Sequence, residues 1–455
     1  MCLPTSLLRR TLPGLLLLLL PYASAAQTTD TVAVERLFKG TDTTYVFTKA
    51  ERDSIRAIVG TAFTAGELTP GKGFEIAHGK HGTVNFSIYA LIRYVNQEPE
   101  SNTFNDHLGR ERSIDPRKDI QWHRTYLYFN GWAFTPKLMW QVNSWAVLST
   151  GQNALIGSLT YRFHKRFNLS GGINGLPSTR SMQGSHPLWQ ANDRAMADEY
   201  FRPGFSSGIW ATGEILPKLS YTAVVTNNLS QLGVGAGQLD RSLSNGYSLL
   251  WMPTTGEFGP RGSYGDWEYH EKIATRFGGG YGRSREDRQN QDLSTTSGNT
   301  QVKISDSQNL FEVGALADTV TVKQAMWQQF AVDGGLKYRG IFLHVEYFQR
   351  LLNEFVADGP LPVKEINENG YMVQASAFPW KKKLELYGFH SYINGKWNTN
   401  YEFGGGLNFY PFDTRYFRVN AHAMHVTDSP ANSVFGFYVG GMTGMIYSLS
   451  TSIIL

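Results

Sequence analysis

The sequence predicts an all-β protein, a transmembrane antiparallel β-barrel of about 16 strands that covers residues 73–455. Three observations lead to this fold class. From about residue 73, apolar and polar residues alternate with a period of two, which is typical of strands with one apolar face. Between these segments, short turns alternate with longer polar loops. The last alternating segment runs to the final residue, where a barrel would close.

The closing segment, 441–455, has one apolar face and one hydroxyl-lined face. Successive side chains of a strand point to opposite sides, so position in the sequence decides the face. The apolar face carries Met445, Tyr447, Leu449, Ile453 and Leu455, and the other face carries Ser448, Ser450 and Ser452. Such an ending resembles the last strand of outer-membrane barrels, which presents a hydrophobic terminal residue to the barrel-assembly machinery. We therefore expect that machinery as a partner.

Residues 1–25 are typical of a signal peptide for Sec-type export. Arg9 and Arg10 precede an apolar stretch over 12–22, and Ala23-Ser24-Ala25 fits the small-residue cleavage pattern. A membrane anchor is the alternative, but the apolar stretch is too short to span a bilayer. The single cysteine, Cys2, leaves with this segment, so the mature chain has no disulfide and no thiolate site.

Composition argues against a nucleic-acid-binding protein and against transmembrane helices. Removing residues 1–25 takes away two of the 42 basic residues and none of the 38 acidic ones, which leaves a formal charge of 40 − 38 = +2. A nearly neutral chain has no bulk attraction for nucleic acid. After residue 25, no stretch of 18 apolar residues exists. Hydrophobic residues make up 41% of the chain, which suits strands that turn one face to water.

Residues 26–72 predict a periplasmic segment with one short helix. Thr48 and Glu51 fit a capping box, and apolar residues follow at helical spacing (Ile55, Ile58 and Val59). The expected helix lies near 49–59, before a link rich in glycine and proline. This segment is either a structural periplasmic element or a plug near the mouth of the barrel.

Sixteen segments are expected to be strands: 83–96, 120–134, 138–147, 154–163, 167–175, 206–215, 219–227, 245–252, 267–283, 328–338, 341–352, 370–378, 383–393, 399–410, 415–426 and 441–455. An even number returns the chain to the side where it began, as closure of an antiparallel barrel requires. Residues 284–327 could hide one more hairpin, which would give 18 strands. A soluble β-sandwich has the same alternation with its apolar faces inward.

Connection lengths favour the barrel over the sandwich. Short turns recur near 135–137, 164–166, 216–218, 338–340, 379–382 and 411–414, whereas longer polar connections cover 97–118, 176–205, 228–244, 284–327 and 353–369. Short turns on one side and long loops on the other are typical of transmembrane barrels. Aromatic residues such as Trp132, Tyr338 and Trp380 flank the short turns, as expected at a membrane interface.

Three stretches carry a resemblance to a known family: Ile173 to Arg180, Asn192 to Arg194 with Phe201 to Gly208, and Asp333 to Lys337 running on to Glu346-Tyr347. In these stretches the chain resembles the phosphate-selective porins of the O/P type, particularly their Bacteroidetes-like members. The resemblance implies a trimeric barrel of sixteen strands, loops that fold inward to narrow the pore, and cationic side chains that guide anions. The chain departs from the family in having no N-terminal coiled coil and no strong basic excess.

Strand parity turns a set of basic residues toward the lumen: Arg93, Lys272, Arg276, Lys337, Arg350 and Arg418. Arg124 shares its parity with Tyr126 and Tyr128, which leaves its direction open. Glu346, Glu385 and Glu402 point inward as well. The basic residues could form an anion-selective track, since arginine and lysine bind phosphate well. Alternatively, they pair with the acids across strands and rigidify a wide, weakly selective pore.

The connection 176–205 is the candidate for a constriction loop. It contains mixed charges and an aromatic residue among several glycines and prolines: Trp189, Asp193, Arg194, Asp198, Glu199 and Arg202. Mixed charge at the waist of a pore would create a transverse field that orients solutes. An ordinary surface loop or a trimer contact is the alternative.

No catalytic, metal or cofactor site is expected. Gly204 to Gly208 fits the letters of a nucleophile elbow around Ser206, but that motif needs a strand before it and a helix after it. His270-Glu271 is not followed by a second histidine at 274, so no zincin motif exists. His78, Lys80 and His81 could bind a metal, but an ordinary segment that enters the first strand explains them as well.

The sequence therefore predicts an outer-membrane porin of Gram-negative type that passes small hydrophilic solutes by passive diffusion, with anions or phosphate as a secondary preference. Expected partners are outer-membrane lipid and small anionic or polar solutes, and the expected oligomer is a homotrimer. Two alternatives remain. One is a barrel-embedded enzyme of the lipase or protease type, and the other is a non-conducting adhesin or scaffold, which loops filling the lumen would favour.

Overall fold

The computed structural model describes residues 73–455 except 148–151, 185, 229–241, 288–301 and 433–435. These residues belong to one compact unit, 47–455. The signal peptide expected at 1–25 and the helix expected at 49–59 lie outside the described residues. Among the residues that are described, no helix is long and apolar enough to cross a membrane.

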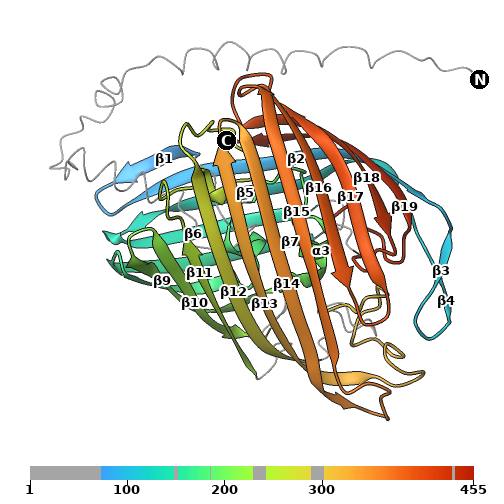
Figure 1. The fold of residues 1–455 in the computed structure, drawn as a ribbon. Helices are drawn as coiled ribbons and strands as arrows, with labels where there is room; N and C mark the ends of the chain where they lie inside the picture. Colours follow the sequence, from blue (N-terminus) through green and yellow to red (C-terminus); the bar gives the residue numbers. More distant parts are fainter. Residues whose placement is uncertain (1–72, 148–151, 185, 229–241, 288–301, 433–435) are drawn as a thin grey trace, which may run out of the picture. The chain divides into compact units, whose positions relative to one another are not determined.

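Sixteen antiparallel strands form a closed barrel (Figure 1). In order they are β2 (Gly82–Pro99), β5 (Lys118–Ala133), β6 (Thr135–Val147), β7 (Gln152–His164), β8 (Phe167–Gly175), β9 (Phe205–Leu216), β10 (Leu219–Asn227), β11 (Leu243–Trp251), β12 (Ala274–Asp287), β13 (Val322–Tyr338), β14 (Ile341–Ala357), β15 (Ile366–Trp380), β16 (Leu384–Asn394), β17 (Thr399–Phe409), β18 (Phe417–Thr427) and β19 (Gly444–Ile454). The barrel closes where β19 pairs with β2, with Ser450 opposite Arg93.

The strand number predicted from the sequence is confirmed. The extra hairpin considered within 284–327 is not seen in the described residues 302–321, where Lys303 and Asn309 form an isolated bridge. Three strand boundaries were wrong by more than four residues: β12 begins at Ala274 and not near 267, β13 begins at Val322 and not near 328, and β14 ends at Ala357 and not near 352.

Apolar and polar side chains alternate along the strands, because one face of each strand meets the outside of the barrel and the other faces the lumen. On β14, Leu343 and Val345 point outward and are 44% and 42% exposed, whereas His344 and Glu346 point inward and are buried. The apolar side chains thus face out, which contradicts a soluble sandwich with inward apolar faces. An outward apolar band around a polar interior is the arrangement of a transmembrane barrel.

A β-bulge in β5 changes the parity of that strand. Leu91 of β2 pairs with Arg124, but the next residue, Ile92, pairs with Trp122, which leaves His123 as an extra residue. Because of the bulge, His123 and Arg124 are both buried, while Trp122 is exposed. Arg124 therefore points inward, and so do the two tyrosines that share its parity.

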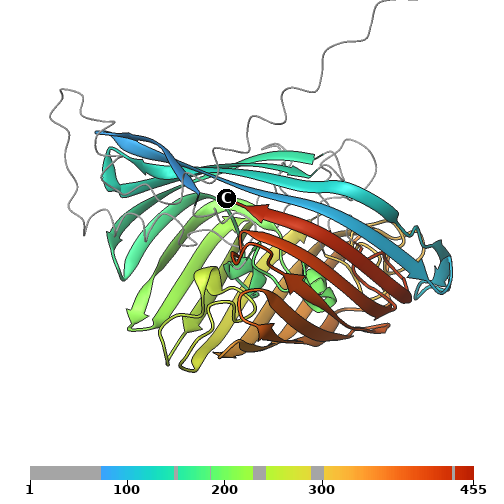
Figure 2. The same ribbon diagram turned by 90° about the horizontal axis from the view of Figure 1, so that it is seen from above.

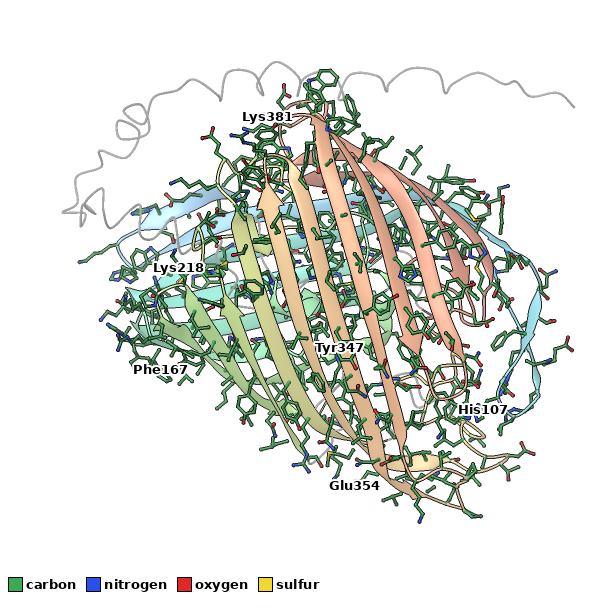
Figure 3. The ribbon with its side chains drawn as sticks, in the orientation of Figure 1. His107, Phe167, Lys218, Tyr347, Glu354 and Lys381 are labelled. Carbon is green, nitrogen blue, oxygen red and sulfur yellow. The ribbon has the colours of Figure 1, made fainter. Side chains whose placement is uncertain are left out.

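The two ends of the barrel differ in their connections. At one end, tight turns join the strands, and residues with positive φ such as Lys218 (69°) and Arg339 (47°) make the reversals. We call it the short-turn end, and the opposite end the long-loop end. In Figure 3, Lys218 and Lys381 mark the short-turn end, and His107 and Glu354 the long-loop end. The short-turn end has one exception to its tight turns, the 22 residues 252–273 between β11 and β12.

Three short strands lie outside the set of sixteen barrel strands. β1 (Phe74–Gly79) forms a hairpin with the start of β2, where the sequence predicted only an entering segment. β3 (Thr103–Asn105) and β4 (Glu111–Ser113) form a separate hairpin in the loop after β2. At the other terminus, the Leu455 and Ile88 backbones exchange two hydrogen bonds of 2.9 and 3.1 Å. The hydrophobic last residue is thus part of the closing seam.

Candidate functional site: the loops inside the barrel

The connection between β8 and β9, residues 176–204, lies inside the barrel, and we call it the lumen loop. It contains a 3₁₀ turn, η2 (Ser181–Gln183), and a short helix, α3 (Met196–Phe201). Figure 2 shows the helix within the ring of strands. Five of the six constriction candidates are buried, namely Trp189, Asp193, Arg194, Asp198 and Arg202, and Glu199 is half-buried. The alternative of an ordinary surface loop is therefore wrong.

Two wall arginines hold the middle of the lumen loop through one carboxylate. Arg93 Nη1 on β2 and Arg124 Nη2 on β5 each lie 2.7 Å from Asp193 Oδ2. All three side chains are nearly inaccessible to solvent. Arg93 also donates to the carbonyl of Gly436 at 3.0 Å, so it links the lumen loop to the long-loop end. Removing one partner of such a buried ion pair strongly destabilises the folded state, because it leaves an unpaired charge away from water.

Helix α3 docks on the wall through its first backbone N–H groups. Met196 N donates to Glu402 Oε1 at 2.6 Å, and Ala197 N donates to Ser391 Oγ at 3.2 Å. These bonds satisfy donors that the first turn of a helix leaves free. At the other end of the helix, the Phe201 ring stacks on Phe348 of β14 at 5.3 Å between centroids. Glu402, which the sequence predicted to face inward, thus positions the helix.

The charges carried by the lumen loop itself form a second network. Arg194 lies 3.7 Å from Asp198 and 3.8 Å from Glu199, and Arg202 lies 2.9 Å from Glu199. Ser181 Oγ donates to Asp198 Oδ1 at 2.7 Å, which ties η2 to α3. Burial raises the pKa of Asp198 to about 6, because the charged carboxylate loses solvation.

Two further wall arginines contact the lumen loop. Arg350 of β14 pairs with Glu368 of the neighbouring strand, and its guanidinium lies over the ring of Tyr200, 4.3 Å from the centroid. Tyr200 also donates to Glu368 at 2.8 Å. Arg418 of β18 donates to the carbonyl of Trp189 and to the side-chain oxygen of Asn192. Both arginines thus act as donors, either to the lumen loop or to an acid on a neighbouring strand.

Residues 252–273, which we call the inner segment, fill the lumen at the short-turn end. Phe258, Ser263 and Asp266 of this segment are buried. Lys337 of β13 is also buried, and its Nζ donates to the carbonyl of Phe258 at 2.8 Å and to Ser263 Oγ at 3.3 Å. A long segment at this end therefore lies inside the barrel and is bonded to its wall.

The lumen loop and the inner segment meet at Arg180. Its Nη2 donates to the carbonyl of Gly262 at 2.8 Å, and the guanidinium lies over the ring of Tyr264, 4.0 Å from the centroid. Arg276 of β12, nearby in this network, donates to Asp333 Oδ1 at 2.7 Å and to Gln183 Oε1 at 3.4 Å. Arg180 belongs to a stretch that carries the family resemblance, but the sequence analysis predicts no role for its side chain.

Lys272 corrects the prediction for the pore-lining residues. It precedes β12 and is exposed, so strand parity does not apply to it. The prediction fails because residues 267–273 belong to the connection before β12 and not to the strand. The remaining predicted cations (Arg93, Arg276, Lys337, Arg350 and Arg418) are all inward and buried, and each donates to protein groups. They do not form a row of free cations.

Several inward polar groups have no hydrogen-bond partner within the described part of the chain. Both imidazole nitrogens of His344, Oε2 of Glu346, the side-chain amide of Gln190 and Nε2 of His422 are buried without one. A buried polar group without a hydrogen bond costs roughly 1–3 kcal/mol, so such groups are normally hydrated. These inward polar groups are therefore suited to bind water.

Two other features, the Gly-x-Ser-x-Gly stretch around Ser206 and a cluster of possible metal ligands, do not make a catalytic or metal site in the described residues. Ser206 lies on β9, which continues as a strand to Leu216, so the strand–turn–helix context of a nucleophile elbow is missing. Ligand atoms of Asp266, Glu268 and His270 lie within 4.8 Å of one another and could hold a cation. However, His270 bonds to Asp266, and Arg415 bonds to Glu268 at 2.5 Å. These contacts account for the cluster as part of the inner segment's fold.

Comparisons with known proteins give a likeness of fold. No protein-family model and no curated protein matches the sequence. Among solved structures, outer-membrane OmpT of Vibrio cholerae is 14% identical over 84% of this chain and 100% of that one, with a TM-score of 0.49. OprB of Pseudomonas putida is 8% identical, with coverages of 82% and 94% and a TM-score of 0.49. The outer-membrane channel DcaP of Acinetobacter baumannii is 8% identical, with coverages of 84% and 99% and a TM-score of 0.48.

The likeness does not extend beyond the barrel fold. At 8–14% identity and TM-scores below 0.5, the three structures say nothing of this chain's solute. The finer resemblance to phosphate-selective porins stays a prediction.

Sequence reasoning missed the inner segment and the roles of Arg124 and Arg180. A signal for the inner segment was present, because Gly256, Gly259, Pro260, Gly262 and Gly265 make a strand across this region improbable. The direction of Arg124 depended on the bulge at His123, which alternation does not reveal.

Proposed function

We propose that the protein is an outer-membrane channel through which small hydrophilic solutes diffuse along a narrow pathway beside the lumen loop. The observation that carries this proposal is the contrast between the two faces of the wall. The outward face is apolar, and the inward face carries buried polar groups, several without a hydrogen-bond partner among the described residues. Such a wall suits lipid outside and water inside.

The orientation follows from the connections. In transmembrane barrels the short turns face the periplasm and the longer loops face the exterior. The lumen loop would then enter from the exterior, and the inner segment would close the periplasmic end. A solute would have to pass both, so size is expected to limit passage more than charge.

Weak ion selectivity is expected. Anion selectivity needs cations that face the pathway, but five inward arginines on the described strands, namely Arg93, Arg124, Arg276, Arg350 and Arg418, are engaged with acids or carbonyls. Arg93 and Arg124 share Asp193, Arg276 pairs with Asp333, and Arg350 pairs with Glu368. We therefore propose passage of small polar solutes with little preference between anions and cations.

Planar-bilayer recording of the purified full chain tests this function. We expect small, discrete conductance steps and a reversal potential close to zero under a potassium chloride gradient. A large reversal potential whose sign shows that anions cross preferentially would overturn the proposed weak selectivity. It would favour the hypothesis of an anion-selective or phosphate-selective pore. If the correctly folded barrel is present in the bilayers and no conductance steps are seen, the proposed channel function is overturned.

A non-conducting barrel is the second candidate, and one observation favours it. The inward side chains of most described strands are buried, because the lumen loop, the inner segment and residues 302–316 pack against them. A liposome-swelling assay separates the two functions. Entry of a small uncharged solute supports the channel, whereas vesicles that stay sealed support an adhesin or scaffold.

A further inference from the structure

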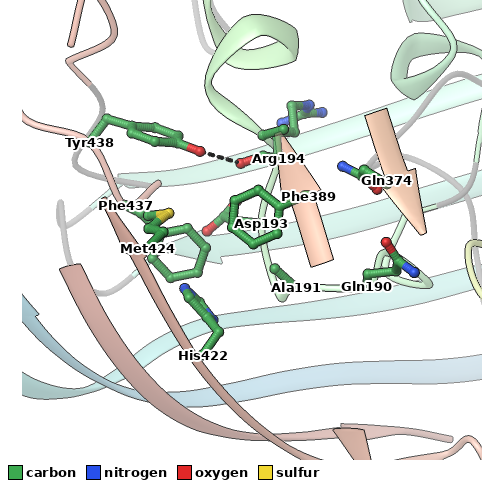
Figure 4. A pocket seen from close by; sticks show the side chains of 11 residues that line it. Gln190, Ala191, Asp193, Arg194, Gln374, Phe389, His422, Met424, Phe437 and Tyr438 are labelled. Carbon is green, nitrogen blue, oxygen red and sulfur yellow. Dashed lines mark hydrogen bonds between the residues drawn. The ribbon is translucent and has the colours of Figure 1, made fainter. Parts of the chain in front are cut away.

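The pocket between the lumen loop and the wall (Figure 4) has room for about one water molecule. Gln190 and His422 line it, and both carry side-chain atoms without a hydrogen-bond partner in the described chain. Water accounts for these atoms, so a larger partner has to be sought on the outer surface of the barrel.

Unpaired positive charge gathers at the short-turn end of that surface. Eight surface lysine and arginine side chains there have no carboxylate partner among the described residues, namely Lys80, Lys137, Arg166, Lys218, Lys272, Arg339, Lys381 and Lys382. All are exposed except Lys382, which is half-buried. Acids at this end are bonded to other bases; Glu214, for example, lies 3.7 Å from Lys165. Of the exposed acids described there, Glu271 alone has no basic partner.

Surface charge at the long-loop end shows no such excess in the described residues. The exposed side chains without an oppositely charged partner there are the acids Glu98, Glu111, Asp115, Glu365 and Asp428 and the bases Lys118, Arg283, Lys364 and Lys396. The nearly neutral composition of the chain therefore conceals a positive short-turn end. A partner that meets this end alone can be recognised by its negative charge.

Exposed aromatic side chains stand beside the unpaired cations. Phe134, Trp380 and Phe412 of the tight turns are 80%, 60% and 68% exposed. Aromatic side chains at the ends of membrane-spanning strands mark the level where hydrocarbon meets the lipid headgroups. The cations on the same turns lie at headgroup depth, where lysine and arginine extend their charge out of the apolar layer.

Three of these cations occupy backbone positions that favour another residue type. The φ angle is 69° at Lys218, 47° at Arg339 and 58° at Lys382. Glycine and asparagine adopt this left-handed conformation at a lower cost. Turn geometry alone does not account for a base at all three positions, which favours a role for the charge itself.

The closest grouping of cations lies where two tight turns meet the inner segment. Lys381 Nζ lies over the ring of Tyr269, 4.2 Å from its centroid. A Cβ atom added to Gly340 would lie 2.8 Å from the same ring, so Tyr269 packs against the turn that carries Arg339. The backbone N–H of Arg339 donates to the carbonyl of His270 at 2.8 Å. Arg339 and Lys381 are thus brought to one short stretch of the inner segment.

Aromatic rings hold the charged atoms of this grouping without neutralising them. Lys382 Nζ lies 4.8 Å from the centroid of the Trp267 ring, and the Arg339 guanidinium carbon lies 5.2 Å from that of Tyr338. A cation–π contact orients a cation but leaves its positive charge in place. These side chains can therefore still bind an anion.

We propose that the short-turn end binds the phosphate headgroups of anionic phospholipids, with Arg339, Lys381 and Lys382 as the principal site. The planar guanidinium can hold two phosphate oxygens, and the two ammonium groups add point charges. Trp380, beside Lys381, would contact the upper part of the acyl chains. An anionic cell-wall polymer fits less well, because it gives the exposed aromatic side chains no hydrocarbon to contact. The site needs a barrel in a membrane and does not depend on conduction.

Native mass spectrometry of the full chain, purified in a neutral detergent, tests the site. Phosphatidylglycerol and phosphatidylcholine with identical acyl chains are added at equal concentration, and the lipids that stay bound are counted. We expect at least about tenfold more phosphatidylglycerol to be retained, because several cations attract the anionic headgroup together. Raising ammonium acetate from about 0.1 M to about 1 M should reduce this preference, because the screening length falls from about 10 Å to about 3 Å.

A triple variant removes the principal site: Arg339→Asn, Lys381→Gln and Lys382→Asn. Asparagine tolerates positive φ, so both strained turns should still form. We expect the preference for phosphatidylglycerol to fall to within about twofold. The matched control is a second triple variant, Lys118→Gln, Lys364→Gln and Lys396→Gln, which removes the same number of exposed, unpaired charges from the long-loop end. It should retain lipid like the wild type.

The variant Lys381→Gln leaves both positive-φ positions unchanged, so it replaces the triple variant if that chain does not fold, and it should weaken the preference severalfold. The site is overturned if the wild type retains both lipids equally, or if the two triple variants lose the preference equally. Co-sedimentation of the wild type with purified peptidoglycan, without a preference between the lipids, would assign the positive end to the cell-wall polymer and contradict the proposal.

Discussion

Arg93 and Asp193 form a buried ion pair of 2.7 Å between residues that are 100 positions apart in the chain. Arg93 belongs to the strand that closes the barrel, and Asp193 lies at the middle of the lumen loop. Arg124 bonds to the same carboxylate oxygen, so two arginines from adjacent strands share one acid. The position of the loop in the lumen should therefore depend on this acid.

Asp193→Asn should release the lumen loop. The variant keeps the shape of the side chain but leaves Arg93 and Arg124 buried without a counter-charge, which costs on the order of 3–5 kcal/mol. We expect single-channel conductance in planar bilayers to rise severalfold. Asp318→Asn is the control, because the side chain of Asp318 is 85% exposed, and it should conduct like the wild type. If both variants conduct like the wild type, the ion pair does not hold the loop.

Gly280 should be needed for the start of the lumen loop to pack against β12. A Cβ atom added there would lie 2.2 Å from the carbonyl oxygen of Pro177, closer than any real contact. At the adjacent Gly279, on the outer face, the nearest atom would be 3.5 Å away. We expect Gly280→Val to displace the start of the loop at a cost of roughly 1–3 kcal/mol, with a raised conductance and a lower unfolding temperature by circular dichroism. Gly279→Val should change neither, and identical behaviour of the two variants would count against this packing.

The fold could be predicted because a barrel in lipid repeats one simple rule. Each strand needs an apolar outward face and a polar inward face, and residues such as Leu343, His344 and Val345 show this alternation directly. The rule failed where the backbone departs from regular pairing. The bulge at His123 reversed the parity of β5, and the glycine-rich inner segment was partly taken for a strand.

The site could be predicted only in part for a different physical reason. The alternation of a strand gives the direction of Arg93 or Arg350, but not the group that the side chain meets inside the barrel. The partners Asp193 and Glu368 lie 100 and 18 positions away, respectively. Only the folded loop decides whether a cation meets water, a carbonyl or an acid, so an open row of cations and a paired network have the same sequence pattern.

The lumen loop should be held more firmly in acid. The pKa of Asp198, about 6 in the buried loop, lies above its ordinary value of 3.8, so the docked loop binds the proton more tightly than a released loop does. This contribution to docking is complete below about pH 4 and is lost as the pH rises through 6. We expect conductance to fall between pH 7.5 and 5. Asp198→Asn should have low conductance at both pH values, because its neutral amide still accepts from Ser181 Oγ. A wild-type pH response in this variant would assign the effect to another group.

Lys337 should hold the inner segment inside the short-turn end. Its buried ammonium donates to the carbonyl of Phe258 and to Ser263, and Lys337→Met would leave both acceptors without that donor, at roughly 1.5–3 kcal/mol for a charged hydrogen bond. We expect chymotrypsin to cut the variant after Phe258 or Tyr264 about tenfold faster than the wild type, as followed by mass spectrometry. Lys323→Met is the control, because the Lys323 side chain is 44% exposed and pairs with an exposed acid. Equal cleavage rates in the wild type and both variants would show that other contacts, such as that of Arg180 with Gly262, are enough to hold the segment.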